Sequence, residues 1–440
     1  MATSGPRVLG LQQEELDAAV EVELDHDDDE DLVSGGRRKR HPSVLQDGVY
    51  VYIARVVRIL FCGHCMSALL LAMPLAVWSR SSGWPDEWVF VLSLLALCPL
   101  AERISFVTED VAKYTSDGLG GLLNATFGNV TELIVSIFAL KAGLIRVVQI
   151  SMLGSILSNC LLVLGCAFLV GGLKHKEQSF NREAASTNCG LLVLAVTALA
   201  VPTLLSQTRA DPVQSASFAA AAVQPLAGNL SSIEPHHDVG DLGLSRFISA
   251  VLLLLYVLLI YFQLGTHSHL FEGDDDDDDP PVLGLWGGIV LLAVITVAIA
   301  VLSEFIVDAI EGAAENLGVP VLFIGTILLP IVGNAAEHAA AIIFGYRDKM
   351  EIALGIAIGS SVQIGVFVIP LCVVLGWAMG QPMDLNFHQF EVWTCLLTTL
   401  VVTATIQDGR ANWLKGVALC CAYLCVAAGY WYHEEPMDLG

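Results

Sequence analysis

The sequence predicts an all-α polytopic membrane protein with about 11 transmembrane helices, namely one peripheral first helix followed by two inverted five-helix repeats. Hydrophobic residues make up 55% of the 440 residues and charged residues only 15%, which is too apolar for a soluble protein. The chain also contains many runs of about 20 apolar residues, the length that spans a bilayer as a helix. Finally, one polar phrase recurs in two of these runs, which indicates an internal repeat.

The apolar runs, separated by polar breaks, define the predicted spans in order. They are residues 54–78, 87–105, 118–140, 147–172, 187–206, 246–264, 284–305, 320–345, 352–378, 389–406 and 412–432. The first helix, within residues 51–80, stands outside the repeat. Residues 87–264 form the first repeat and residues 284–432 the second. Five spans per repeat give the two repeats opposite orientations, an arrangement that secondary transporters use for alternating access.

Three polar segments flank or join these parts. Residues 1–50 have no apolar signal-peptide core, so they are predicted to be a disordered cytosolic segment that could regulate the protein. The linker of residues 265–283 carries the acidic run Asp274–Asp279 and is predicted to be a hydrated cytosolic linker, which is preferred to a cation-attracting or regulatory role. Lys and Arg concentrate in the loops on the side of the N-terminus, which places the C-terminal tail, residues 433–440, on the opposite side.

The formal net charge of -24 comes largely from the solvated segments rather than from a uniformly acidic surface. The sequence has no broad basic face to bind phosphates, which disfavours nucleic-acid binding. The 11 cysteines lack the spacing of a secreted disulfide framework. Cys62-Gly63-His64-Cys65 resembles half of a zinc site without a second ligand pair, and packing is the preferred interpretation. We therefore expect no resident cofactor.

The repeated phrase identifies the candidate site. It reads Gly128-Asn129-Val130-Thr131-Glu132 in the first repeat and Gly333-Asn334-Ala335-Ala336-Glu337 in the second, 205 residues later. A Gly-Ser pair follows each phrase at the same offset, Gly154-Ser155 and Gly359-Ser360. An asparagine and a glutamate three residues apart project from one face of a helix, so each repeat presents a carboxylate beside an amide.

These residues predict a site for a hard divalent cation. The predicted cation and proton ligands are Glu132 and Glu337, and the metal set also includes Asn129 and Asn334. Gly128 and Gly333 let the helices loosen and expose backbone carbonyls, which is tolerated in a membrane only where the backbone lines a site. The supporting shell is predicted to contain Ser155, Ser158, Ser360 and Gln363. An oxygen-only set with two acids suits Ca²⁺ better than a soft-ligand metal.

The two acids also predict a mechanism. A charged side chain at the centre of a membrane helix costs about 2.5–3.5 kcal/mol on insertion scales, so both carboxylates must be neutralised. Either a cation or protons can neutralise them, and the two compete for the same oxygens. If the protein reorients when loaded with either but not when empty, this competition produces antiport, with Ca²⁺ as a transported substrate.

Further polar residues are candidates for a proton route. They are Glu102, Glu304, Asp308 and His338. Glu102 and Glu109 are seven residues apart, as are Glu304 and Glu311, but Glu109 and Glu311 lie near helix ends, where solvation is expected. Solvation at a helix end is an equal alternative for Glu102 and Glu304. His338 is alternatively a neutral structural histidine.

At these residues the chain resembles the cation/proton exchanger family of the calcium/cation antiporter superfamily, most closely the plant vacuolar members. The resemblance covers about residues 50–432 and rests on the two phrases, the second continuing to His338. It implies export of cytosolic Ca²⁺ across the vacuolar membrane in exchange for lumenal protons, with Glu132 and Glu337 as shared ligands. It also implies a lumenal C-terminus and an N-terminal segment that restrains activity. Selectivity between Ca²⁺ and Mn²⁺, and homo-oligomer formation, stay open.

Two other classes of function are alternatives to antiport. A Ca²⁺-permeable channel would more naturally supply its carboxylates as rings through oligomeric symmetry, whereas the inverted repeat favours a carrier. A membrane-embedded enzyme lacks support, because the sequence has no H-E-x-x-H pair and no phosphate-binding G-x-x-x-x-G-K-[ST] loop. An exchanger mainly for Mn²⁺ is the remaining alternative within the same class.

Overall fold

A computed structural model describes residues 57, 65–115, 120, 123, 126–221, 239–267 and 281–433, with no side-chain detail at 65–66, 207–221 and 239–241. All of them belong to one compact unit, Pro42–Gly440. Several predicted features lie outside the described residues. They are the segment 1–50, most of the linker 265–283, nearly all of the tail 433–440, and Cys62, Gly63 and His64.

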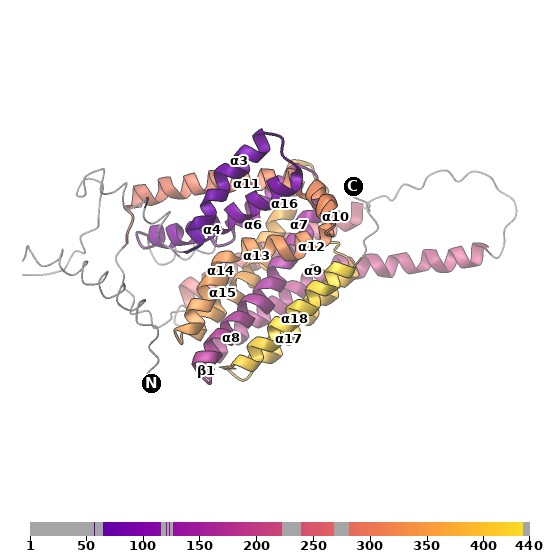
Figure 1. Ribbon diagram of the computed structural model, residues 1–440. Coiled ribbons are helices and arrows are strands. Elements are labelled where there is room, and N and C mark those ends of the chain that lie inside the picture. The colour runs from indigo at the N-terminus through magenta and orange to yellow at the C-terminus, as the bar shows by residue number, and fades with distance from the viewer. Residues whose placement is uncertain are drawn as a thin grey trace, which may run out of the picture. The chain divides into compact units, whose positions relative to one another are not determined.

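The described chain is almost entirely helical (Figure 1). The first part contains η1 (Cys65–Leu71), α3 (Ala72–Ser81), α4 (Asp86–Ala112), α6 (Val130–Lys141), α7 (Ile145–Leu157), η2 (Ser158–Val163), α8 (Leu164–Lys174), α9 (Arg182–Ala221), α10 (Val239–Tyr261) and η3 (Phe262–Thr266). The second part contains α11 (Leu285–Leu317), α12 (Val321–Phe323), η5 (Ile324–Leu328), α13 (Leu329–Gly333), α14 (Ala335–Tyr346), α15 (Met350–Gln363), η6 (Ile364–Val368), α16 (Ile369–Met379), α17 (Gln389–Ile406) and α18 (Trp413–Tyr432).

The polytopic all-α fold is confirmed. Among the described residues, eight helices are long and apolar enough to cross a membrane, and a bent pair, Val321–Gly333 with Ala335–Tyr346, makes a ninth. The predicted spans 54–78 and 118–140 are described only in part, as η1 with α3 and as α6. The count of about 11 spans therefore stays a prediction.

The predicted helix ends are least accurate where a helix continues beyond its apolar run. The predicted span 389–406 coincides with α17, but α11 continues to Leu317, beyond the predicted end at residue 305. Its 33 residues correspond to about 50 Å, which exceeds the bilayer core of about 30 Å. The last turns carry exposed acids such as Glu311 and Glu315, because a helix satisfies its own backbone hydrogen bonds whether or not its side chains are apolar.

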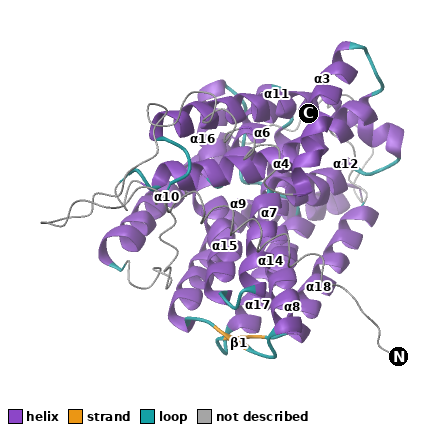
Figure 2. Ribbon diagram, turned by 60° about the vertical axis from the view of Figure 1, so that its left-hand side comes forward, coloured by secondary structure: helices purple, strands orange, loops and turns teal. Residues whose placement is uncertain are grey.

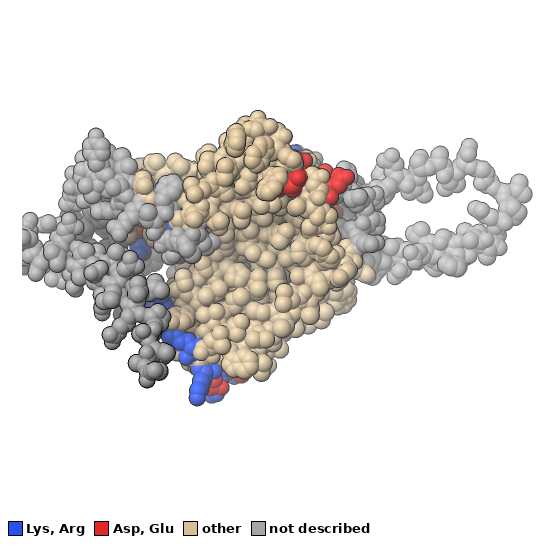
Figure 3. Space-filling model, viewed as in Figure 1, with Lys and Arg blue, Asp and Glu red and all other residues tan. Residues whose placement is uncertain are grey.

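The surface has the pattern of a membrane protein. All eight tryptophans lie at or next to helix ends and are at least 39% exposed, the positions of an interfacial aromatic belt. Between them, large apolar side chains face outward, as Val290, Val294 and Val297 do on α11. Figure 3 shows Asp and Glu gathered at the upper right and Lys and Arg at the lower edge, with an uncharged surface between them. This surface matches the hydrocarbon part of a bilayer.

Two helix groups organise the interior. Helices α4 and α11 pack along one another, and the two views place them side by side (Figures 1 and 2). Helix α8 packs against α14 and α18, where glycines allow close approach. A Cβ on Gly345 would lie 2.7 Å from the carbonyl oxygen of Ala167, and one on Gly416 would lie 2.7 Å from that of Gly165. These contacts bind helices of the two repeats into one packed unit.

A two-residue antiparallel pair closes one end of this unit. Strand β1 (Gln178–Ser179) pairs with β2 (Arg410–Ala411), with Gln178 opposite Ala411 and Ser179 opposite Arg410. The pair joins the α8–α9 connection to the α17–α18 connection, at the bottom of Figure 2. It therefore links the first repeat to the second at one membrane surface.

Candidate functional site

Both repeated phrases interrupt a helix. Helix α6 begins at Val130 with Asn129 as its N-cap, and α14 begins at Ala335 with Asn334 as its N-cap. The segments on either side of Asn334 are bent by 56°. Glu132 and Glu337 are therefore in the first turn of helices that start within apolar segments. The unpaired backbone N–H groups and the positive end of the helix dipole at such a start favour a negative charge.

The tertiary structure brings the two phrases into contact. A Cβ added to Gly333 would lie only 2.9 Å from Oε1 of Glu132, so the carboxylate of the first phrase packs against the glycine backbone of the second. Real Cβ atoms essentially never come so close to another heavy atom, and a larger residue at position 333 would displace the acid. Glycine is needed here for close approach, in addition to any role in loosening the helix.

The two asparagines cross between the repeats. Asn129 donates from Nδ2 to Oε1 of Gln363 at 2.8 Å, and Asn334 donates from Nδ2 to the backbone oxygen of Ser155 at 3.3 Å. Each asparagine of one repeat thus binds the helix that follows the phrase in the other repeat. Because the amide nitrogen makes the bond in both, the amide oxygen is the atom left for a cation.

The two acids are buried and largely without partners. Glu132 is 6% exposed and Glu337 is 8% exposed. Among the described residues, neither carboxylate oxygen of Glu132 nor Oε2 of Glu337 has a hydrogen-bond partner. The two groups also lie within range of electrostatic interaction. Two buried carboxylates that lack cationic partners are stable only when a cation or protons neutralise them.

A cavity of about 500 Å³ leads to this site from one end of the molecule. Gly128, Glu337, Ser360 and Gln363 form its inner wall. Its outer wall reaches residues at helix ends, including Glu109 near the end of α4, Asn181 before α9 and Glu351 at the start of α15. The acid pair is therefore approached from the end where α4 finishes and α9 and α15 begin.

The predicted supporting shell is assembled in part. Ser360 and Gln363 line the cavity, and Ser155 is buried with its backbone oxygen bonded to Asn334. Ser158 is fully buried where η2 begins, and among the described residues no hydrogen bond joins it to either phrase. The π-helical segments η2 and η6 start at nearly equivalent positions of the two repeats. Such segments are frequent at functional sites, and sequence reasoning did not anticipate them.

The four candidates for a proton route have different surroundings. The carboxylate of Glu102 lies 3.5 Å from Nε of its neighbour Arg103, and Glu304 is exposed on α11. Asp308 pairs with Arg80 at 2.7 Å, with both side chains more than 40% exposed. His338 is half-buried in α14. In the described structure none of the four lines the cavity, and the exposure of Glu304 matches its solvated alternative.

Sequence reasoning missed two buried asparagines near the site. Asn159 is fully buried in η2, and neither atom of its amide has a hydrogen-bond partner among the described residues. Its position four residues after Ser155, hence on the same helix face, was the available signal. Asn188 of α9 lines the cavity and is 7% exposed. No motif marks Asn188, because its relation to the site depends on how α9 packs.

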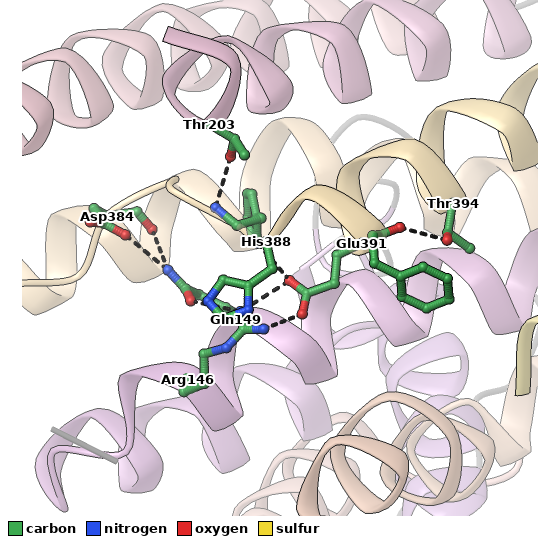
Figure 4. A network of polar contacts seen from close by, with 9 residues as sticks. Arg146, Gln149, Thr203, Asp384, His388, Glu391 and Thr394 are labelled. Atoms are coloured by element: carbon green, nitrogen blue, oxygen red, sulfur yellow. Dashed lines mark hydrogen bonds and ion pairs between the residues drawn. The ribbon is translucent and has the colours of Figure 1, made fainter. Parts of the chain in front are cut away.

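A polar network joins the start of α7 to the segment before α17 and to Thr203 of α9 (Figure 4). The guanidinium of Arg146, on α7, donates to both carboxylate oxygens of Glu391, on α17. Gln149 donates to Oδ1 of Asp384 at 2.9 Å, and the backbone N–H of Phe387 donates to the hydroxyl of Thr203 at 2.8 Å. The network ties α7 and α9 of the first repeat to the α16–α17 connection of the second. These bonds join the two repeats away from the mouth of the cavity.

The donor set fits a transported hard cation. Among the described residues no group of three His, Cys, Asp or Glu side chains could hold a metal ion. The site instead offers two carboxylates, two amide oxygens and backbone carbonyls at the helix breaks. This oxygen chemistry suits Ca²⁺, and two charges with adaptable neutral ligands suit an ion that must be released again.

Comparison with known proteins matches this architecture. The model of the sodium/calcium exchanger protein family matches residues 87–265 and 287–432. The vacuolar cation/proton exchanger 2 of Arabidopsis thaliana is 45% identical over 394 residues, covering 87% of this chain and 84% of that protein. The vacuolar cation/proton exchanger 3 of Oryza sativa subsp. japonica is 45% identical over 396 residues, covering 87% and 89%.

A solved structure shares the fold. Native YfkE is 35% identical in sequence, with a TM-score of 0.69, and the match covers 84% of this chain and 100% of that chain. A second structure of YfkE, 33% identical with a TM-score of 0.66, is described as that of a Ca²⁺/H⁺ antiporter. The two matched ranges of the family model correspond closely to the two predicted repeats.

Proposed function

The chain belongs to the sodium/calcium exchanger protein family, and from this premise we propose that it is a secondary antiporter that exchanges Ca²⁺ for protons. One observation carries the proposal. Glu132 and Glu337 are buried, come from two phrases in contact, and have carboxylate oxygens without hydrogen-bond partners among the described residues. The relatives support the coupling ion, since they are cation/proton exchangers and a Ca²⁺/H⁺ antiporter.

The mechanism follows from what can occupy the acid pair. A Ca²⁺ ion bound between Glu132 and Glu337 would neutralise both charges and take further oxygens from Asn129 and Asn334. When the ion leaves, protons would occupy the same carboxylates. The protein would reorient in either neutral state and would be prevented from reorienting while both carboxylates are bare, because bare charges are costly at membrane depth. Each crossing then carries either Ca²⁺ or protons, which couples the two flows.

Two helix groups could provide the movement. Helices α3, α4 and α11 are tied to one another by Arg80 with Asp308, by Glu87 with Asn316 at 2.7 Å, and by Tyr114 with the carbonyl of Leu283. The hydrogen bonds of the site and of the network in Figure 4 join helices of the other group, α6–α10 and α13–α17. Relative movement of two internally bonded groups would close the cavity and open the opposite end.

The direction and location of transport are part of the same proposal. The relatives named above are vacuolar exchangers, which supports placement in the vacuolar membrane. With the N-terminus in the cytosol, the cavity mouth would lie on the cytosolic side, because Lys174 ends α8 and the α8–α9 and α14–α15 connections carry Lys176, Arg347 and Lys349. The described conformation would then be the one that accepts cytosolic Ca²⁺. Residues 1–50 would restrain transport, and their removal should raise the rate.

Flux through reconstituted protein tests the function. Purified protein in sealed proteoliposomes should accumulate Ca²⁺ when an imposed pH gradient makes the interior acidic, and uptake should stop when the gradient is collapsed. Glu132→Gln and Glu337→Gln should each insert normally and abolish uptake. Normal proton-driven uptake by either variant would reject the shared-ligand mechanism.

The same assay separates the alternatives. Uptake at channel-like rates without dependence on the proton gradient would indicate a Ca²⁺-permeable channel. Competition by Mn²⁺ at concentrations far below those of Ca²⁺ would indicate an exchanger mainly for Mn²⁺. Neither a channel nor a Mn²⁺ exchanger makes or breaks covalent bonds. On each of these alternatives, as on the proposed antiport, the protein is a transporter rather than an enzyme.

A further inference from the structure

The wall of the cavity has polar groups at successive depths. Helices α9 and α15 pack side by side, and both start at the cavity mouth. On α15, Glu351 lies at the mouth, and Ser360 and Gln363 lie deeper in the same wall. At a rise of 1.5 Å per residue these two residues are about 14 Å and about 18 Å further in. A cation entering the cavity therefore passes a long stretch of α15 that carries no charge beyond Glu351.

One polar side chain of α9 lies along that stretch. Asn188 lines the cavity, seven residues after Asn181 and thus about 10 Å deeper. The two asparagines have different surroundings. The side-chain oxygen of Asn181 accepts from the backbone N–H groups of Glu183 and Ala184 and so caps the helix. The side-chain oxygen of Asn188 is buried and has no hydrogen-bond partner among the described residues.

A buried amide oxygen without a hydrogen-bond partner is costly. Leaving such a group unsatisfied costs about 1–3 kcal/mol, whereas an apolar side chain of the same shape would avoid the penalty. The neighbouring cavity residues Ala184 and Ala185 and the buried Cys189 show that this part of α9 accepts apolar side chains. A half-turn about the last side-chain bond of Asn188 exchanges the places of its nitrogen and oxygen, so the oxygen can occupy either place in the wall of the cavity.

We propose that Asn188 is an intermediate ligand for the transported divalent cation, between the mouth at Glu351 and the acid pair. The proposal rests on the proposed function. The amide oxygen of Asn188 replaces one water of the hydrated ion before the ion reaches Ser360, Gln363 and Glu337. A neutral oxygen at this depth assists dehydration without holding the ion as strongly as a carboxylate would.

Sided transport kinetics test the proposal. Wild-type protein, Asn188→Leu, Asn188→Asp and the control Thr187→Val are reconstituted in proteoliposomes, and Ca²⁺ flux is measured from the cavity side and from the opposite side. Thr187 is the adjacent residue, and its hydroxyl already donates to the carbonyl of Glu183 in its own helix. Asn188→Leu should raise KM on the cavity side about tenfold, equivalent to about 1.4 kcal/mol, and leave KM on the opposite side unchanged. Asn188→Asp should lower KM on the cavity side, and Thr187→Val should change neither value.

Each result supports or overturns the inference. An unchanged cavity-side KM in Asn188→Leu, or an equal rise on both sides, would show that Asn188 acts only in packing. If Asn188→Leu does not insert, Asn188→Asp decides, because an unchanged cavity-side KM in that variant rejects a ligand role. Wild-type Ca²⁺ flux without proton dependence would reject antiport while leaving the sided comparison valid. Wild-type protein that moves no Ca²⁺ would overturn both.

Discussion

Asn129 and Gln363 are 234 residues apart in the chain and 2.8 Å apart in the structure, where the amide nitrogen of the first donates to the amide oxygen of the second. Asn129 is the N-cap residue of the helix that carries Glu132, and Gln363 is the last residue of α15. The reciprocal contact runs from Asn334 to Ser155. Each acid-bearing helix start is thus anchored to the opposite repeat, so movement of one repeat relative to the other would disturb both halves of the site.

The first prediction concerns this anchor. Asn129→Ala should raise the KM for Ca²⁺ about tenfold, since it removes one ligand oxygen and the bond that holds α6 in place. Gln363→Ala should raise KM by a smaller factor, and the double variant should raise it by less than the product of the two single effects. Ca²⁺ uptake, measured separately from each side of the membrane, gives the KM of the two single variants and of the double variant. Strictly multiplicative effects would show that the two residues act independently.

A second prediction concerns the contact between the phrases. Gly333→Ala should reduce Ca²⁺ uptake at least about tenfold, because a Cβ at this position would lie 2.9 Å from Oε1 of Glu132 and displace that carboxylate. Gly359→Ala is the matched control, since a Cβ on that glycine would meet nothing within 4 Å. Helical Gly→Ala replacements without a clash are neutral or stabilising. Equal activity of both variants would contradict the observed packing.

A third prediction follows from competition at the carboxylates. Lowering the pH on the side from which Ca²⁺ enters should raise its KM, because protons then occupy Glu132 and Glu337 more often. In the range where the pair is mostly protonated, KM should rise about tenfold per pH unit if one proton is displaced and about a hundredfold if two are. The maximal rate at saturating Ca²⁺ should change less. A KM that does not depend on pH would show that protons and Ca²⁺ use separate sites.

The fourth prediction tests the network in Figure 4. Arg146→Ala should lower the free energy of unfolding by about 3–5 kcal/mol, because it leaves the carboxylate of Glu391, only 1% exposed, without its charged partner. Arg410→Ala is the matched control, since Arg410 pairs with Glu177 where both side chains are more than 60% exposed, and such pairs contribute about 0–1 kcal/mol. Thermal unfolding in detergent compares the two. Equal shifts in Tm would show that burial does not distinguish these ion pairs.

The sequence alone was sufficient for the helical membrane fold and for the two phrases. Apolar length is a local property, so the predicted span 389–406 coincides with α17. The sequence alone did not predict the end of α11, since a helix can continue after its side chains become polar. It also left the role of Asp308 open, because the partner Arg80 lies 228 residues away in the chain.

For the site, the sequence by itself determined the candidate ligands. Acids and amides within apolar runs cost free energy to bury, and the repeat of the phrase can be read directly from the order of residues. Only the tertiary structure decided that Glu132 packs against Gly333, that Asn129 reaches Gln363, and that the cavity leads past Asn188. The physical reason is that these relations depend on how helices from different repeats pack. Helix packing is determined by the shapes of many side chains together, which no local pattern records.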